Sequence, residues 1–146
     1  MFLYPAVGFH FAVYFHGLLP TPIDVSFQSV TGLSVSVETE NYKEGGENRY
    51  VHDIPTGLKF STLTLKRGLK SIPSPLTKWC EGVYEDFKFK PLNLIVLLLD
   101  ENHLPIHRWS VIDAYPIKYE IGEFNAETAG IVLQTLELKY NFFKSL

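Results

Sequence analysis

Several stretches of the chain alternate between apolar and polar residues, and this period of two predicts strands with one buried face. The first is residues 7–16, whose apolar face consists of Val7, Phe9, Phe11, Val13 and Phe15. Residues 25–30 form a second short strand. In a third strand, residues 30–38, we expect the side chains of Leu33, Val35 and Val37 to face inward.

The second half of the chain also predicts strands, preceded by an alternating segment at residues 59–68. Residues 92–99 are so rich in aliphatic side chains that we expect them to be buried on both faces. The polar residues 100–103 form a turn, so residues 104–114 pair back as a hairpin. The pattern of residues 115–122 is weaker, because Pro116 indicates an edge or the start of a strand.

The last strand, residues 135–142, has two distinct faces. The inward set is Leu136, Leu138, Tyr140 and Phe142. The outward set is polar and of mixed charge, and consists of Thr135, Glu137, Lys139 and Asn141. Because terminal strands often lie at sheet edges, we expect this strand to be open to pairing with a neighbour's backbone.

One helix is expected after residue 74. Ser74 suits the N-cap position, and Pro75 suits the first helical position. The apolar residues that follow recur with the helical period and form one stripe, Leu76, Trp79, Cys80, Val83 and Phe87. Seven or eight strands with a single helix predict a mainly β protein, an antiparallel sandwich or barrel.

Composition sets the class of protein. The 146 residues suffice for one domain with a substantial core, and the apolar fraction of 46% excludes a disordered chain. A net charge of −3 gives no reason to expect a nucleic-acid site. The first Lys or Arg is Lys43, so the apolar N-terminal stretch lacks the positive residues of a signal peptide, and no apolar run suits a membrane anchor. We therefore expect a protein that stays in the cytoplasm until other components move it.

The polar segment between residues 38 and 53 is long for a hairpin connection, and such length indicates a functional arm or a disordered tip. Adjacent glycines make a sharp reversal easy there. Candidates for contacts between subunits are the residues near this tip, Tyr42, Lys43, Glu44, Gly45, Gly46, Glu47, Asn48 and Arg49. Lys66 and Arg67, at the end of a strand, are further candidates, because Arg pairs well with a neighbour's carboxylate.

Side chains that could carry chemistry do not form a site on sequence criteria. His103 and His107 are four residues apart with Pro105 between them, and this spacing aligns two metal ligands only in a helix. His10 and His16 are roughly 20 Å apart along a strand that rises about 3.3 Å per residue. Cys80 has no activating charge beside it. We predict no catalytic residue, no metal and no cofactor.

A series of short segments, in order, resembles the tail tube proteins of contractile phages and phage-like injection systems. They are YPAVGFHF at residues 4–11, FQSVTGL at 27–33, YKEGGEN at 42–48, LKRG at 65–68, LTKW at 76–79, WSVIDAYP at 109–116, and FNA at 124–126 with TLELKY at 135–140. The type VI secretion tube protein has a related fold. The resemblance covers nearly the whole chain.

The resemblance implies a single domain over residues 1–146, with two packed antiparallel sheets, a flanking helix and an extended hairpin arm at about residues 38–58. It implies hexameric rings that join through sheet edges and stack into a rigid hollow tube, which a contractile sheath drives through a target envelope. The implied partners are further copies of the chain and the sheath, baseplate and cap or terminator proteins. A cargo effector in the bore is a further candidate partner, and the outward set of the last strand is the candidate bore-facing surface.

Three alternatives stay open on the sequence alone. The chain is a main tube subunit or the tube initiator at the baseplate. It is, alternatively, a monomeric β-sandwich that binds a carbohydrate or a peptide through its arm. The third alternative is a small enzyme with a histidine-based site.

Overall fold

The computed structural model describes residues 10–18, 26–42, 52–68, 74–122 and 132–146, which form ten strands and one helix. The elements are β1 (His10–Phe15), β2 (Ser26–Phe27), β3 (Ser29–Thr31), β4 (Val35–Tyr42), β5 (His52–Phe60), β6 (Leu63–Gly68), α2 (Pro75–Asp86), β7 (Leu92–Leu99), β8 (Pro105–Ile121), β9 (Leu133–Lys139) and β10 (Phe142–Ser145). The count exceeds the expected seven or eight strands because short breaks divide three of the predicted ones, the third at residues 140–141, whereas the predicted segments 104–114 and 115–122 join in β8. Gln28 separates β2 from β3, and residues 61–62 separate β5 from β6. No described helix is both long and apolar enough to cross a membrane.

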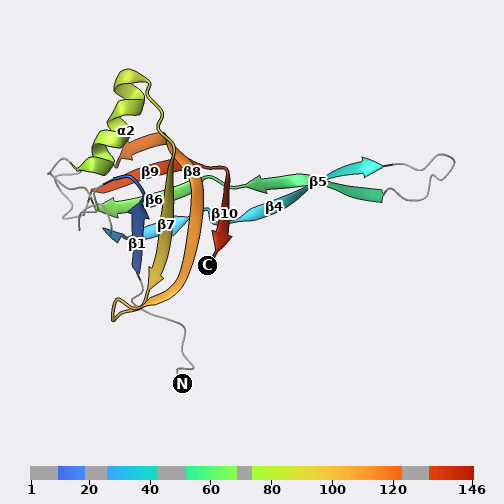
Figure 1. The fold of residues 1–146 in the computed structure, drawn as a ribbon, viewed down its shortest axis with the longest axis horizontal. Helices are drawn as coiled ribbons and strands as arrows, with labels where there is room; N and C mark the ends of the chain where they lie inside the picture. The colour runs from blue at the N-terminus through green and yellow to red at the C-terminus, as the bar shows by residue number, and fades with distance from the viewer. Residues whose placement is uncertain (1–9, 19–25, 43–51, 69–73, 123–131) are drawn as a thin grey trace.

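Two antiparallel sheets form the body (Figure 1). The first sheet has the order β2–β1–β7–β8, with β10 on the other side of β8; the second has the order β8–β9–β6–β3. The long strand β8 belongs to both sheets, because it pairs with β7 over residues 105–114 and with β9 over residues 115–121. The predicted mainly β architecture with one helix is therefore confirmed.

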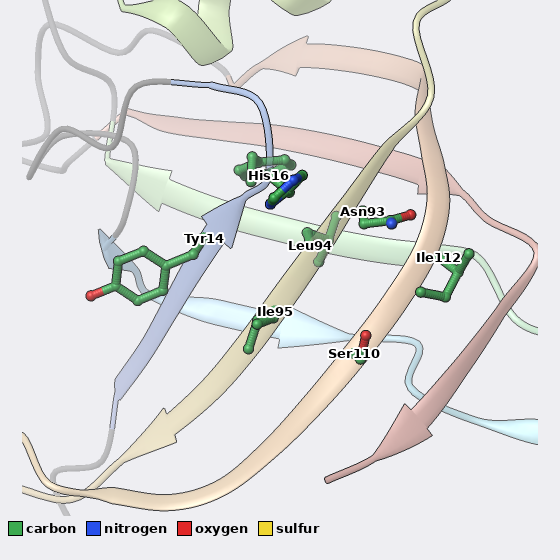
Figure 2. A pocket seen from close by; sticks show the side chains of 8 residues that line it. Tyr14, His16, Asn93, Leu94, Ile95, Ser110 and Ile112 are labelled. Carbon is green, nitrogen blue, oxygen red and sulfur yellow. The ribbon is translucent and has the colours of Figure 1, made fainter.

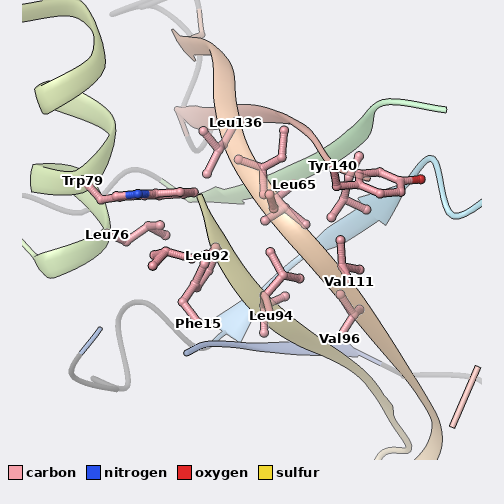
Figure 3. Close-up of a cluster of buried hydrophobic side chains, with 14 of the residues drawn as sticks. Phe15, Leu65, Leu76, Trp79, Leu92, Leu94, Val96, Val111, Leu136 and Tyr140 are labelled. Atoms are coloured by element: carbon pink, nitrogen blue, oxygen red, sulfur yellow. The ribbon is translucent and has the colours of Figure 1, made fainter. Parts of the chain in front are cut away.

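The core lies between the two sheets and under the helix, and Figure 3 shows its aliphatic centre. Leu94 and Val96 of β7 belong to one cluster with Leu65 of β6 and Leu138 of β9, and all four side chains are buried. The ring of Trp79 closes the end near the helix, 5.6 Å from the ring of Phe15. Its indole Nε1 donates a 2.8 Å hydrogen bond to the carbonyl of Lys90, which satisfies the one polar atom of the side chain.

The helix begins as predicted. The hydroxyl of Ser74 accepts a hydrogen bond from the backbone N–H of Thr77, and Pro75 occupies the first helical position. Leu76, Trp79 and Cys80 are buried, but the expectation that Phe87 continues this stripe is wrong. Phe87 adopts left-handed backbone angles as the C-cap, with φ of 52°, so the helix ends there and its side chain is 80% exposed.

Pro116 lies inside a continuous 17-residue strand rather than at a strand start. The alternative expectation, an edge position, is confirmed, because β8 pairs only with β9 at this residue. It occurs where the register with β9 shifts, at a position that does not need a backbone donor. A second irregularity lies at Asp113, whose φ of 55° is left-handed. Asn93 accepts a hydrogen bond from the backbone N–H of Asp113, and Asn141 donates to its carboxylate, so side chains from β7 and from the segment between β9 and β10 fix this bulge.

Three expectations about strand faces are wrong. Residues 92–99 are not buried on both faces, because Ile95 is exposed on the outer face of the first sheet. Val35 and Val37 do not face the core, because β4 leaves the body to pair only with β5. Phe142 lies after a break at residues 140–141 and is exposed, although Leu136, Leu138 and Tyr140 are buried as predicted.

The terminal strand is also not an edge strand. Strand β9 pairs with β8 on one side and with β6 on the other, so its backbone is already satisfied within the chain. Among the described residues, β2 and β10 are the outermost strands of the first sheet, and β3 and residues 115–121 of β8 are the outermost strands of the second.

Candidate assembly surfaces

The arm is a two-stranded ribbon made of β4 and β5, and it projects away from the body (Figure 1). Every described residue of the ribbon except Phe60 is exposed, so both faces of the ribbon are open to solvent. Tyr42 is the last described residue of β4. The remaining candidate contact residues of the tip, Lys43 to Arg49, lie outside the described residues. A ribbon of only two strands is marginally stable alone, so a surface that covers it would stabilise it.

A β-bulge changes which side chains share a face of the ribbon. Below it, the register pairs Val37 with Leu58; beyond it, Glu40 pairs with Ile54 and Asn41 with Asp53. The hydroxyl of Thr56 donates a 3.2 Å hydrogen bond to the carbonyl of Glu38, which holds the extra residue in place.

Two apolar clusters result from this register. The base cluster consists of Val35, Val37 and Leu58 on one face, and Leu58 is 63% exposed. The distal cluster, Tyr42 and Ile54, lies on the opposite face. A spacing of four would place Ile54 and Leu58 on the same face of a regular strand, so the bulge is what separates them.

The outer face of the second sheet is polar, and it carries most of the candidate bore-facing residues. Lys66 pairs with Thr135, which pairs with Glu120; Glu137 pairs with Lys118. Lys118 and Glu120 form an exposed salt bridge of 3.4 Å. Thr135 and Glu137 are half-buried, and Lys139 is exposed. Asn141 lies beyond β9 and binds Asp113. Sequence reasoning missed Lys118 and Glu120, because the pattern of residues 115–122 gave no clear face.

Arg67, one of the predicted contact residues, does not lie on the surface. It is only 5% exposed, because alternation along β6 directs it inward while Lys66 points out. Its Nε donates a 2.6 Å hydrogen bond to Oε1 of Gln134, and its guanidinium lies 5.4 Å from the ring centre of Phe27. The structure therefore assigns Arg67 to the interior of the subunit. Lys66 is exposed and remains a predicted contact residue.

A groove lies on the outer face of the first sheet (Figure 2). It encloses about 300 Å³ between β1, β7 and β8. Its lining is largely apolar and includes Tyr14, Ile95 and Ile112, with Asn93 and Ser110 between them. Tyr14 and Ile95 are exposed although they are large and apolar, which sets this face apart from the polar face of the second sheet.

Two of the histidines, His10 and His103, are in contact, and His107 lies apart from them. His103 is in the β7–β8 turn, where its Nδ1 lies 2.7 Å from Nε2 of His10. His107 is on β8 and contacts the hydroxyl of Ser145. Within the described part of the chain, no three side chains of His, Cys, Asp or Glu are grouped so that they could hold a metal ion. Cys80 is buried in the helix stripe.

Solved structures of contractile injection systems contain chains with this fold. A chain in the cryo-EM structure of the anti-feeding prophage baseplate, 6-fold symmetrised, is 31% identical, with a TM-score of 0.80 over 98% of this chain and 96% of that one. A chain in the PVC sheath-tube complex of an extracellular contractile injection system is 21% identical, with a TM-score of 0.75 over 99% and 94%. Hcp1 from Flavobacterium johnsoniae is 11% identical, with a TM-score of 0.54 over 93% and 94%. A comparison with curated protein sequences finds no match.

The fold and these neighbours define the class: a tail tube-like structural protein of contractile injection systems. Residues 7–144 match the model of the T4-like virus tail tube protein gp19 family, and the chain belongs to that family. The resemblance that the short sequence segments indicated is thereby confirmed.

Proposed function

We propose that the chain is a subunit that forms hexameric rings, which stack into the rigid inner tube of a contractile injection system. The observation that carries this proposal is the arm, a ribbon with apolar clusters on both faces that the described part of its own chain leaves exposed. In a family of tube proteins, further copies of the chain are the natural cover. A closed ring also pairs the outermost strands of each subunit, which would otherwise remain open to aggregation.

In the proposed tube, the outer face of the second sheet is turned toward the bore. The polar face of the second sheet, with Thr135, Glu137 and Lys139, suits a water-filled bore through which cargo passes without adhering. The sheath, baseplate and cap proteins are the other partners. Assembly takes place in the cytoplasm, and the tube then acts within the phage tail or injection particle.

Replacement of residues 42–49 by a short Gly-Ser linker tests the role of the arm. Because the sequence of this segment is polar, we expect the circular dichroism spectrum to stay β-rich while rings and tubes are lost. A matched control replaces Glu101 and Asn102 of the β7–β8 turn by Gly and Ser, and it should assemble normally. If the shortened chain still forms rings, residues 42–49 of the arm are not needed for assembly.

A second candidate is the tube initiator, the first ring at the baseplate. Its support is the gradient of sequence identity: 31% to the chain in the baseplate structure, against 19% and 21% to chains in the cap and sheath-tube structures. Quantitative mass spectrometry of isolated particles distinguishes the two roles. The copy number of a main tube subunit increases with tube length, whereas an initiator stays at one ring's worth.

A further inference from the structure

The outer face of the first sheet has an ordered row of side chains that runs across the strands. Tyr14 pairs with Ile95, Ile95 pairs with Ser110, and Ser110 pairs with Lys144. Residues paired in this way point to the same face. The row therefore begins with the exposed side chains of Tyr14 and Ile95 beside the groove and ends with the ammonium group of Lys144 in β10.

The arm presents the same order of chemistry on one of its faces. The base cluster of Val35, Val37 and Leu58 comes first, and Asp53 lies on the same face beyond the bulge, opposite Asn41. Because the bulge moves Ile54 to the other face, it is Asp53 that continues the face of Leu58. The result is an apolar patch followed by a single carboxylate.

The two surfaces match in length. The row from Tyr14 to Lys144 crosses three strand spacings, roughly 14 Å at about 4.8 Å each. From Leu58 to Asp53 there are five residues, roughly 16 Å at about 3.3 Å each. An arm that lies across the strands can therefore place its apolar base in the groove while its carboxylate reaches the ammonium group.

We propose that the arm of one copy lies across the outer face of the first sheet of a second copy, with Leu58 in the groove and Asp53 beside Lys144. This inference rests on the proposed function and names the surface that receives the arm. It covers two exposed apolar surfaces at once and compensates a charge of each sign. Opposite charges at the rim fix the register of such a contact, and the apolar base supplies most of the binding energy.

Disulfide trapping tests this contact directly. A double variant, Asp53→Cys with Lys144→Cys, is oxidised under assembly conditions and analysed by non-reducing electrophoresis. Cys80 is buried and stays unchanged, so it does not interfere. The expected result is a ladder of covalent oligomers that collapses on reduction. The control pair, Asp53→Cys with Lys118→Cys, places the second thiol on the polar face and should give no ladder.

Charge reversal supplies a second test that does not depend on oxidation. Asp53→Lys and Lys144→Glu should each lower the assembled fraction several-fold, and the two together should restore it. Leu58→Ser should lower it as well, whereas Lys59→Ser, on the opposite face of the ribbon, should not. Rings that form without a ladder and without charge rescue overturn this contact and leave the proposed function intact. A wild-type chain that forms no rings removes both.

Discussion

Gln134 accepts a 2.6 Å hydrogen bond from Nε of Arg67 inside the subunit. Its amide group also donates to the hydroxyl of Tyr119, so one side chain of β9 links β6 to β8. Buried polar groups of this kind stabilise a fold only while each keeps its partner. The contact also explains why a charged residue at the end of β6 points inward.

Substitution of this amide by an apolar side chain removes an acceptor from a buried cation. Gln134→Leu should lower the free energy of unfolding by roughly 1.5–3 kcal/mol, the range for hydrogen bonds to charged groups. Urea unfolding followed by circular dichroism gives the value, with an unchanged m-value. Gln134→Glu keeps an acceptor and should be clearly more stable than Gln134→Leu. Equal stability of the two variants would show that the contact contributes little.

Substitution by alanine should change the stability of the fold in opposite directions at Gly32 and Gly82. Gly32 has φ of +99°, and a Cβ there would lie 1.9 Å from the carbonyl oxygen of Thr62, so Gly32→Ala should destabilise by more than the roughly 1–3 kcal/mol of backbone strain. Gly82 is in the helix with nothing within 4 Å of an added Cβ. Gly82→Ala should stabilise by roughly 0.5–1 kcal/mol. Thermal unfolding of both variants compares them, and a shift of the same sign in each would contradict this account.

The stability of the fold should decrease at alkaline pH because of the hydroxyl of Tyr140. Burial raises the pKa of Tyr140 above its ordinary value of 10.0, and the hydroxyl donates to the carbonyl of Gly32. Because the folded state holds this proton more tightly, the contribution to stability is complete below pH 10.0 and decreases as the pH rises through the folded pKa. Tyr140→Phe should lower stability at pH 7 by roughly 0.5–1.5 kcal/mol and lose less on alkalinisation. Urea midpoints across this pH range are the measurement, and identical pH slopes in both proteins would exclude Tyr140 as the cause.

The two faces of β9 should respond differently to substitution. Leu138 is 0% exposed, so Leu138→Asp brings an unpaired charge into the core and should unfold the domain. Replacement of Glu137 and Lys139 by Ser should preserve folding and assembly, because neither side chain is buried in the core. Circular dichroism and negative-stain microscopy of both variants test this. Loss of assembly in the Ser variant with a folded Leu138→Asp variant would mean that the faces are reversed.

The sequence predicted local structure well where one residue type decides it. The start of the helix follows from Ser74 and Pro75, and the inward face of β9 follows from strict alternation. The sequence prediction failed at the C-terminal end of the helix, where the apolar period continues past the last helical residue. Phe87 continues the helical spacing but comes after the helix has ended.

The surfaces were less accessible to sequence reasoning. Val35 and Val37 alternate as core strands do, and nothing local reveals that β4 leaves the body. The row on the first sheet joins residues from β1, β7, β8 and β10, so only the pairing of distant strands brings Tyr14 and Lys144 to one face.

The mass of the purified protein under native conditions tests the central claim most directly. Light scattering combined with negative-stain microscopy should find rings near six times the 16.7 kDa of one chain, or stacks of such rings. A strictly monomeric protein over the whole accessible concentration range, particularly one that binds a carbohydrate or a peptide through the arm, would contradict the account.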